Sequence, residues 1–170
     1  MTCSICDAIS KRDGVLFEDD KIVVMLAQNP AATGHMMILP KSHAPIIEKV
    51  PDFVVDSMFV AANKASFSLF ESLGALGTNV LLQNGPAAGQ SENHVILHVI
   101  PRFENDGLSF EWKPRQVSED QLKSIAGQLS GAASRTVGII EKEKPKPLEE
   151  KKPEEVGKGD WREKYLRRIP

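Results

Sequence analysis

The sequence of 170 residues contains only two cysteines, Cys3 and Cys6, which excludes the disulfide framework of a small secreted domain. No apolar run approaches the roughly 18 residues that span a bilayer, and the first residues lack the basic and hydrophobic stretches of a signal segment. The formal net charge is only -2, so no excess of one sign marks a binder of nucleic acids or membrane surfaces. These absences favour a soluble cytoplasmic protein without a membrane partner.

Charge and proline content divide the chain into three predicted parts. Residues 1–140 carry the apolar patterns of one folded domain. Residues 141–159 mix Lys, Glu and Pro with few apolar side chains, and we interpret them as a linker because they cannot offset the entropy of ordering. Residues 160–170 form a short amphipathic tail in which three apolar side chains at helical spacing alternate with four cations: Trp161, Tyr165 and Ile169, then Arg162, Lys164, Arg167 and Arg168.

Apolar spacing within residues 1–140 predicts strands and helices in alternation. A short helix over residues 3–14 precedes a hairpin over 16–27, whose strands join at the acidic turn Asp19-Asp20-Lys21, and a buried strand between Gly34 and Pro40. The main packing helix covers 52–73 and closes before Gly74, with a predicted apolar face of Val55, Met58, Phe59, Ala62, Ala65, Leu69 and Leu73. Strands over 78–84 and 93–103 follow, and a late amphipathic helix begins at a capping box over 118–121. This order predicts an α+β fold with an antiparallel sheet.

The segment GQSENHVILHVIPR, residues 89–102, carries the strongest functional signal. His94, Ile96 and His98 alternate along a predicted strand and so share one face. With GHMMILPKSH at 34–43 and QNGPAAGQ at 83–90, the chain resembles the histidine-triad (HIT) family over roughly residues 3 to 105. The resemblance implies a five-stranded antiparallel sheet with packing helices, joined across a homodimer, and a site for purine nucleotides.

The resemblance also implies a covalent mechanism, in which the central histidine of the triad attacks the α-phosphorus. This chain has Ile96 at that position, and an aliphatic side chain offers neither a lone pair nor a proton. His98 lies two residues further along the strand, about 7 Å away, which is too far for in-line attack unless the substrate shifts. We therefore expect a protein that has lost nucleotidyl hydrolase or transferase catalysis.

Two further positions depart from the family pattern. Ala27 stands where an acidic residue usually holds the ribose hydroxyls, and Gln83 stands where asparagine is usual. Polar groups that resemble the family's nucleotide-binding residues remain at four positions. These are Gln83, Gln90, Ser91 and His98. The departures at Ile96, Ala27 and Gln83 have three explanations: a naturally inactive member of the family, an engineered substitution, or an altered chemistry. Three altered positions favour natural divergence over a single engineered substitution.

Cysteine and histidine also suggest a metal site. A C-x-x-C turn supplies two thiolates. Structural zinc sites have four tetrahedral ligands, and two imidazoles would complete such a set. One branch of the HIT family is similar, and it implies a structural zinc ion bound by Cys3, Cys6, His43 and His94. The alternatives are buried or frayed thiols, or a redox pair, although no thioredoxin-like context surrounds the motif. We interpret His35 as a hydrogen-bonded core residue.

Two classes of function follow from these residues. The first is a non-catalytic HIT protein that serves as a binding or interaction module, with weak purine nucleotide affinity or with a protein or ribonucleoprotein partner at residues 160–170. The second is an active hydrolase that acts on nucleoside phosphate esters, phosphoramidates or dinucleoside polyphosphates by an altered mechanism. Residues 160–170 have three alternatives: they pack on the domain or on the other subunit of a dimer, they bind an external partner, or they form a free tail.

Overall fold

The structure is a computed structural model that describes residues 3–136 of the chain. The chain divides into two compact units, Met1–Ser109 and Phe110–Pro170, and each is described by itself. The predicted boundaries near residues 141 and 160, and with them the linker and the basic tail, lie outside the described residues.

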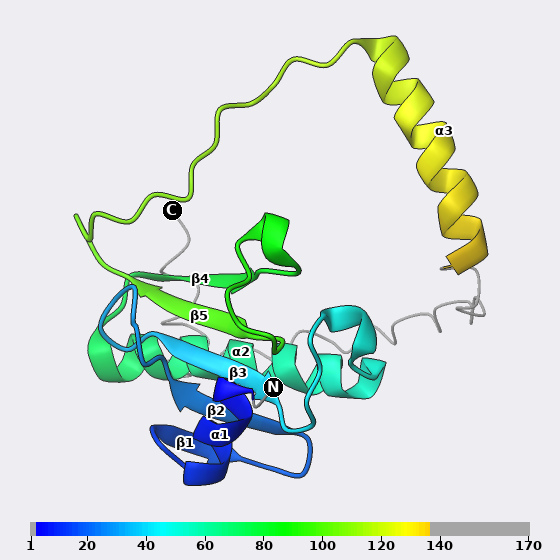
Figure 1. Cartoon of the computed structure of the whole chain (residues 1–170). Coiled ribbons are helices and arrows are strands. Elements are labelled where there is room, and N and C mark those ends of the chain that lie inside the picture. Colours follow the sequence, from blue (N-terminus) through cyan, green and yellow to red (C-terminus); the bar gives the residue numbers. More distant parts are fainter. Residues whose placement is uncertain (1–2, 137–170) are drawn as a thin grey trace, which may run out of the picture. The chain divides into compact units, whose positions relative to one another are not determined.

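The first unit is built on one antiparallel sheet of five strands in the order β1-β2-β3-β5-β4 (Figure 1). The strands are β1 (Val15–Glu18), β2 (Ile22–Leu26), β3 (Met36–Pro40), β4 (Gly77–Leu82) and β5 (Leu97–Arg102). The sheet confirms the predicted α+β fold. At the predicted β1–β2 turn, the Asp19 carboxylate accepts hydrogen bonds from the backbone N–H groups of Lys21 and Ile22.

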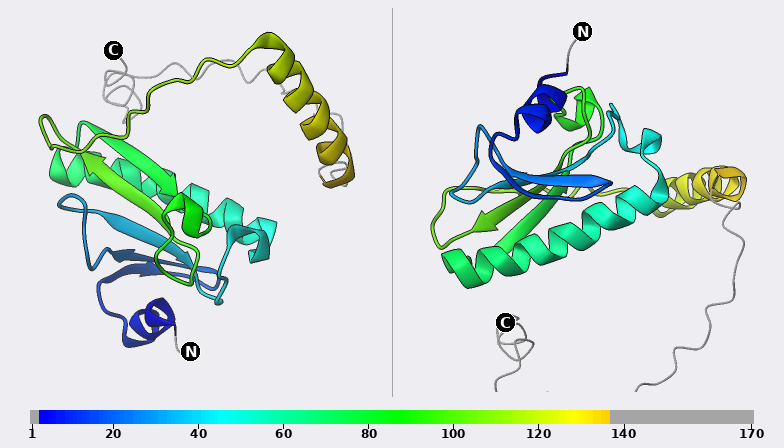
Figure 2. Two further views of the ribbon diagram at one scale, coloured as in Figure 1. Left: turned by 45° about the horizontal axis from the view of Figure 1, so that its top comes forward. Right: turned by 90° about the horizontal axis from the view of Figure 1, so that it is seen from below.

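Two helices cover opposite faces of this sheet, α1 (Ser4–Lys11) and α2 (Asp52–Leu73), as Figure 2 shows. Residues alternate between the faces along each strand, so neighbours in β2 and β3 enter different apolar clusters. Val24 and Ile38 pack in the cluster with α2, whereas Met25 and Met37 pack in the cluster with α1. The smaller cluster under α1 is the one that contains Ile96, whereas Val95, Leu97 and Val99 belong to the cluster with α2.

Helix α2 follows the predicted bounds but not the whole predicted face. Met58, Ala62, Ala65 and Leu69 are buried, as expected, and Gly74 closes the helix in the left-handed conformation. Phe59 and Leu73 are 49% and 45% exposed, so their predicted burial was wrong. A helical step of one residue turns a side chain by about 100°, and Phe59 follows the buried Met58.

Length and apolar composition alone would also allow α2 to cross a membrane. Its face of Met58, Ala62 and Leu69 is instead packed against the sheet, which is what the core helix of a folded domain requires. The helix therefore gives only weak support for a membrane span.

Three further elements complete the described chain: the 3-10 turns η1 (Ile47–Lys49) and η2 (Pro86–Ala88), and helix α3 (Glu119–Thr136). The predicted capping box is present at α3, because the N–H of Gln121 donates to Oγ of Ser118 and the N–H of Ser118 donates to Oε1 of Gln121. Strand β5 begins at Leu97, four residues later than predicted, so His94 and Ile96 lie in the segment before it.

Candidate functional site

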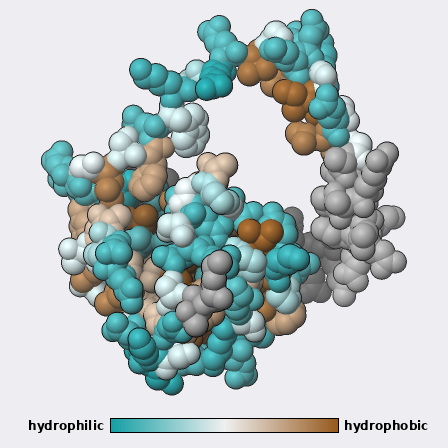
Figure 3. Space-filling model, in the orientation of Figure 1, coloured by the Kyte–Doolittle hydropathy of each residue, from teal (hydrophilic) through white to brown (hydrophobic). Residues whose placement is uncertain are grey.

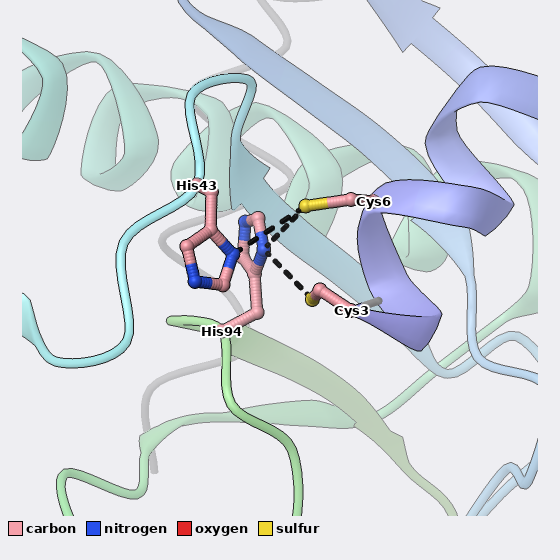
Figure 4. Close-up of side chains that lie close together, drawn as sticks. All are labelled: Cys3, Cys6, His43 and His94. Carbon is pink, nitrogen blue, oxygen red and sulfur yellow. Dashed lines mark hydrogen bonds between the residues drawn. The ribbon is translucent and has the colours of Figure 1, made fainter. Parts of the chain in front are cut away.

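Four predicted ligands, Cys3, Cys6, His43 and His94, meet beside α1 (Figure 4). One potential ligand atom from each residue lies within 4.8 Å of the others. Sγ of Cys6 is 3.5 Å from Nδ1 of His43 and 3.6 Å from Nδ1 of His94, and Sγ of Cys3 is 3.6 Å from the same His94 nitrogen. Three separate segments thus converge on one point.

Local structure explains this convergence. Cys3 is the residue before the first turn of α1 and Cys6 lies within that turn, so the spacing of three places both thiols on one side of the helix. His43 follows the end of β3, and His94 precedes β5, which is the neighbour of β3 in the sheet. The sheet therefore brings both imidazoles to the same end, and α1 packs above them through Ile5 and Ala8.

The His94 ring is oriented for metal binding by a backbone carbonyl. Its Nε2 lies 3.0 Å from the carbonyl oxygen of Pro40, which can only accept, so Nε2 carries the proton and donates it. Nδ1 therefore keeps its lone pair toward the two thiols. Burial lowers the pKa of His94, which keeps the ring in the neutral form that a metal ion requires.

Three sulfur–nitrogen distances in this cluster match those of a tetrahedral zinc site. Zinc–sulfur and zinc–nitrogen bonds of about 2.3 and 2.0 Å place tetrahedral S and N ligands about 3.5 Å apart, and the three S–N distances are 3.5 to 3.6 Å. Burial raises the pKa of the Cys6 thiol, so a metal ion would have to displace its proton on binding. Four protein ligands leave no open position for water, which suits a structural site rather than a catalytic one.

A second histidine pair lies near this cluster. The backbone N–H of Ala31 donates to Nδ1 of His35, so the proton of that ring resides on Nε2. This Nε2 lies 3.1 Å from Nδ1 of His98 and donates to it, which leaves the His98 proton on its own Nε2. His35 is buried and hydrogen-bonded, as the sequence predicted.

Both rings of this pair are neutral near pH 7. Burial and, to a smaller extent, His35 lower the pKa of His98 to about 4, and burial also lowers the pKa of His35. His98 therefore offers a hydrogen-bond donor but no positive charge to a phosphate group at this pH.

Between the two histidines of the motif, Ile96 is 9% exposed and belongs to the apolar cluster under α1. It packs with residues of α1, β2 and β3, namely Ile5, Ala8, Met25, Met37 and Leu39. Ala27 lies against the same cluster and brings no carboxylate to it. This face of the sheet is therefore a continuation of the core.

The remaining space beside the motif is a cavity of about 10 Å³, lined by Gln83, Gln90, Ser91, Glu92, His94, Ile96 and His98. That volume holds about one water molecule, whereas pockets for drug-sized ligands measure roughly 300–1,000 Å³. All four residues predicted to face a nucleotide, Gln83, Gln90, Ser91 and His98, lie around this cavity.

Gln90 is engaged in holding the loop. Its Nε2 donates to the carbonyl oxygens of Pro45 and Glu92, and its Oε1 accepts from the backbone N–H of Gly85. Its amide is thus committed to the backbone rather than to a ligand.

The sequence analysis missed the role of Glu92. Its carboxylate lines the cavity and accepts a hydrogen bond of 2.5 Å from Oγ of Ser4 on α1. The only available signal was a negative charge beside Ser91, in the loop that resembles a phosphate-binding segment. The carboxylate adds negative charge where the resemblance implies a phosphate group.

Comparison with known proteins places this sheet and its flanking helices in one class of fold. A HIT protein of Bacillus subtilis has a similar structure, with a TM-score of 0.71 and 26% identity over 77% of this chain and 96% of that one. The HIT domain family matches residues 10–105, and the chain belongs to this family.

Two other proteins are informative relatives. The adenylylsulfatase HINT3 of Arabidopsis thaliana is 35% identical over 125 residues, which cover 74% of this chain and 59% of that protein. A zinc-bound histidine-triad protein of Mycobacterium smegmatis has a TM-score of 0.60 and 30% identity, over 78% of this chain and 98% of that one. The chain thus spans less than two thirds of the plant relative.

Proposed function

We propose that this chain is a non-catalytic HIT protein, stabilised by a structural zinc ion, that acts in the cytoplasm as a binding or interaction module. The observation that carries the proposal is the position of Ile96. Its aliphatic side chain lies between His94 and His98, where the family resemblance implies a nucleophile, and it is packed into an apolar cluster. Covalent nucleotidyl transfer has no attacking atom at that position.

Three features of the surroundings support weak rather than tight nucleotide binding. The cavity is only about 10 Å³, and Glu92 adds a carboxylate to its wall. The neutral His98 supplies no charge to balance a phosphate group. A buried phosphate group needs a compensating positive charge, so a site that offers a neutral imidazole and a carboxylate instead should bind a charged ligand weakly.

Titration calorimetry with AMP and GMP, beside a hydrolysis assay with adenosine 5'-phosphoramidate, tests this proposal. We expect weak or undetectable binding and no turnover. Turnover accompanied by a covalent nucleotidyl-protein would instead select an active hydrolase with an altered mechanism.

The zinc part of the proposal is supported by the three S–N distances of 3.5 to 3.6 Å among the four predicted ligands and by the zinc-bound relative of Mycobacterium smegmatis. Such an ion would hold the first turn of α1 against the end of the sheet through Cys3, Cys6, His43 and His94. It would supply binding energy to folding rather than chemistry to a substrate.

A homodimer joined through the sheet is also part of the proposal. Strand β4 lies at one edge of the sheet, where Val80 is 45% exposed. An edge strand presents backbone groups that a second copy can pair with. Light scattering coupled to size-exclusion chromatography should give twice the mass of one chain. A mass equal to one chain would contradict the proposed homodimer.

A further inference from the structure

The four predicted metal ligands come from three segments of the chain, and two of these segments are joined by hydrogen bonds that need no metal ion. The backbone N–H of Val95 donates to the carbonyl oxygen of Ala44, 2.8 Å away. Nε2 of Gln90 donates to the carbonyl oxygen of Pro45 at 2.7 Å. The protein itself therefore holds the two imidazole-bearing segments against each other.

The third segment carries both thiols on α1, and this helix packs on the sheet through few side chains. It has eight residues, and its buried side chains are those of Ile5 and Ala8. Isolated helices shorter than about 12–15 residues are marginal in water, so α1 depends on its contacts with the rest of the domain. The thiols of Cys3 and Cys6 can face the imidazoles only while those contacts hold.

A hydrogen bond at the edge of the metal cluster joins this helix to an imidazole-bearing segment. Oγ of Ser4 donates to the Glu92 carboxylate at 2.5 Å, and a bond to a charged acceptor is roughly twice as strong as one between neutral groups. Ser4 directly follows Cys3, and Glu92 lies two residues before His94. Ser4 is exposed and Glu92 is half-buried, and the surface around α1 is mainly hydrophilic (Figure 3). Replacing the Ser4 hydroxyl therefore leaves the apolar cluster under α1 intact.

We propose that Ser4 and Glu92 are positioning residues of the metal site, and that their hydrogen bond keeps α1 docked with both thiols facing the imidazoles before an ion binds. The apparent dissociation constant of a site is its intrinsic value divided by the fraction of molecules already in the competent arrangement. By raising that fraction, the bond tightens metal binding without contacting the ion. This inference rests on the zinc ion of the proposed function and adds the residues that set its affinity.

The loop that contains Gln90 and Glu92 has a clear role in this arrangement. Gln90 ties the loop to Pro45, which lies two residues after His43, and Glu92 ties it to α1. Two side chains of one loop thus link all three ligand-bearing segments. In this chain, the loop that resembles a nucleotide-binding segment supports the metal site.

Transfer of zinc from the loaded, full-length chain to a chromophoric chelator measures metal affinity and tests the inference. S4A should bind zinc about fivefold more weakly than the natural chain. Alanine is the best helix former, so this loss would not come from a weaker helix. S4T keeps the hydroxyl and should retain the natural affinity. S10A removes a hydroxyl that bonds within α1, to the carbonyl oxygen of Cys6, and should also retain it.

A double-mutant cycle separates the hydrogen bond from the charge of Glu92. E92A should weaken zinc binding by more than S4A does, because it removes both the acceptor and a negative charge close to the cation. D7N removes an equal charge beside Cys6 and shows the effect of charge alone. In the E92A background, S4A should have no further effect, because the partner of the hydroxyl is already absent. Equal effects of S4A in the two backgrounds would overturn the inference.

Two further measurements distinguish positioning from a purely structural role. The absorption bands of thiolate-bound cobalt should be the same in S4A and in the natural chain, and a changed spectrum would overturn the inference because the ligand set itself would then differ. A bond that forms equally with and without metal would lower the thermal midpoint of both forms and leave the affinity unchanged, which would also overturn it. Failure of the natural chain to bind zinc would instead overturn the proposed structural metal ion, and this inference with it.

Discussion

Nε2 of His35 lies 3.1 Å from Nδ1 of His98, and this contact fixes the proton positions of both rings. His35 can donate because its own Nδ1 is occupied by the N–H of Ala31. His98 is thereby held neutral with an Nε2–H group. The chain thus places an oriented, neutral imidazole beside the aliphatic side chain of Ile96 at the small cavity.

The His35–His98 pair predicts a loss of stability in acid. The folded-state pKa of His98 is about 4, below the usual value of 6.5, so the unfolded chain binds a proton more readily. The contribution of His98 to the free energy of unfolding should therefore be greatest above about pH 6.5. It should fall by at most about 3 kcal/mol as the pH drops toward 4. Urea unfolding at pH 7 and pH 5 measures this.

H98Q is the control for this slope, because glutamine does not titrate. The variant should lose less stability between pH 7 and pH 5 than the natural chain. Equal slopes in the two proteins would assign the acid sensitivity to other groups, such as the metal ligands.

The metal cluster predicts that stoichiometric zinc copurifies with the protein. C6S should lose the ion and lower the midpoint of thermal unfolding, on the order of 10 °C, because metal binding contributes directly to folding. K11A, on the same helix but outside the cluster, should keep both the ion and the midpoint. Less than about a tenth of an equivalent of zinc, in protein purified without chelator, would argue against a structural metal ion.

Restoring the nucleophile should recover little activity. I96H should show weak hydrolysis of adenosine 5'-phosphoramidate, because Ala27 still leaves the ribose without a carboxylate. The histidine should also destabilise the apolar cluster under α1, whereas I96V should remain inactive and cost about 1 kcal/mol. Full family-like rates in I96H would show that only one position had diverged.

The C-terminal segment predicts a separable interaction. Deleting residues 141–170 should leave dimerisation and zinc content intact and abolish capture of a partner from native host lysate. Ribonuclease sensitivity of the captured complex would identify RNA as the surface that the four cations and three apolar groups of residues 160–170 bind. Equal capture by the full-length and truncated chains would contradict the predicted role of this tail.

Local patterns in the sequence predicted much of this fold, because the elements obey local rules. Helix α2, the Asp19 turn and the capping box at Ser118 were all predicted from spacing and turn chemistry. The exposure of Phe59 and the late start of β5 at Leu97 were not, because both depend on which neighbour packs against the segment.

The candidate site was predicted unevenly for the same reason. Cys3, Cys6, His43 and His94 have side chains suited to one metal ion, and the structure brings all four together. The Ser4–Glu92 hydrogen bond joins residues 88 positions apart, and no local pattern marks it.

His94 belongs to two structures at once, since its Nδ1 faces the thiols of the metal cluster while its ring lines the small cavity beside Ile96. Under the proposed function, substitutions at different positions of the motif therefore have different consequences. A change at position 96 removes catalysis and still fills the core, whereas a change at position 94 removes a metal ligand and loosens the N-terminal helix. Under that proposal, the imidazole at position 94 belongs to the folding of the N-terminal helix, and the side chain at position 96 belongs to the packing of the core.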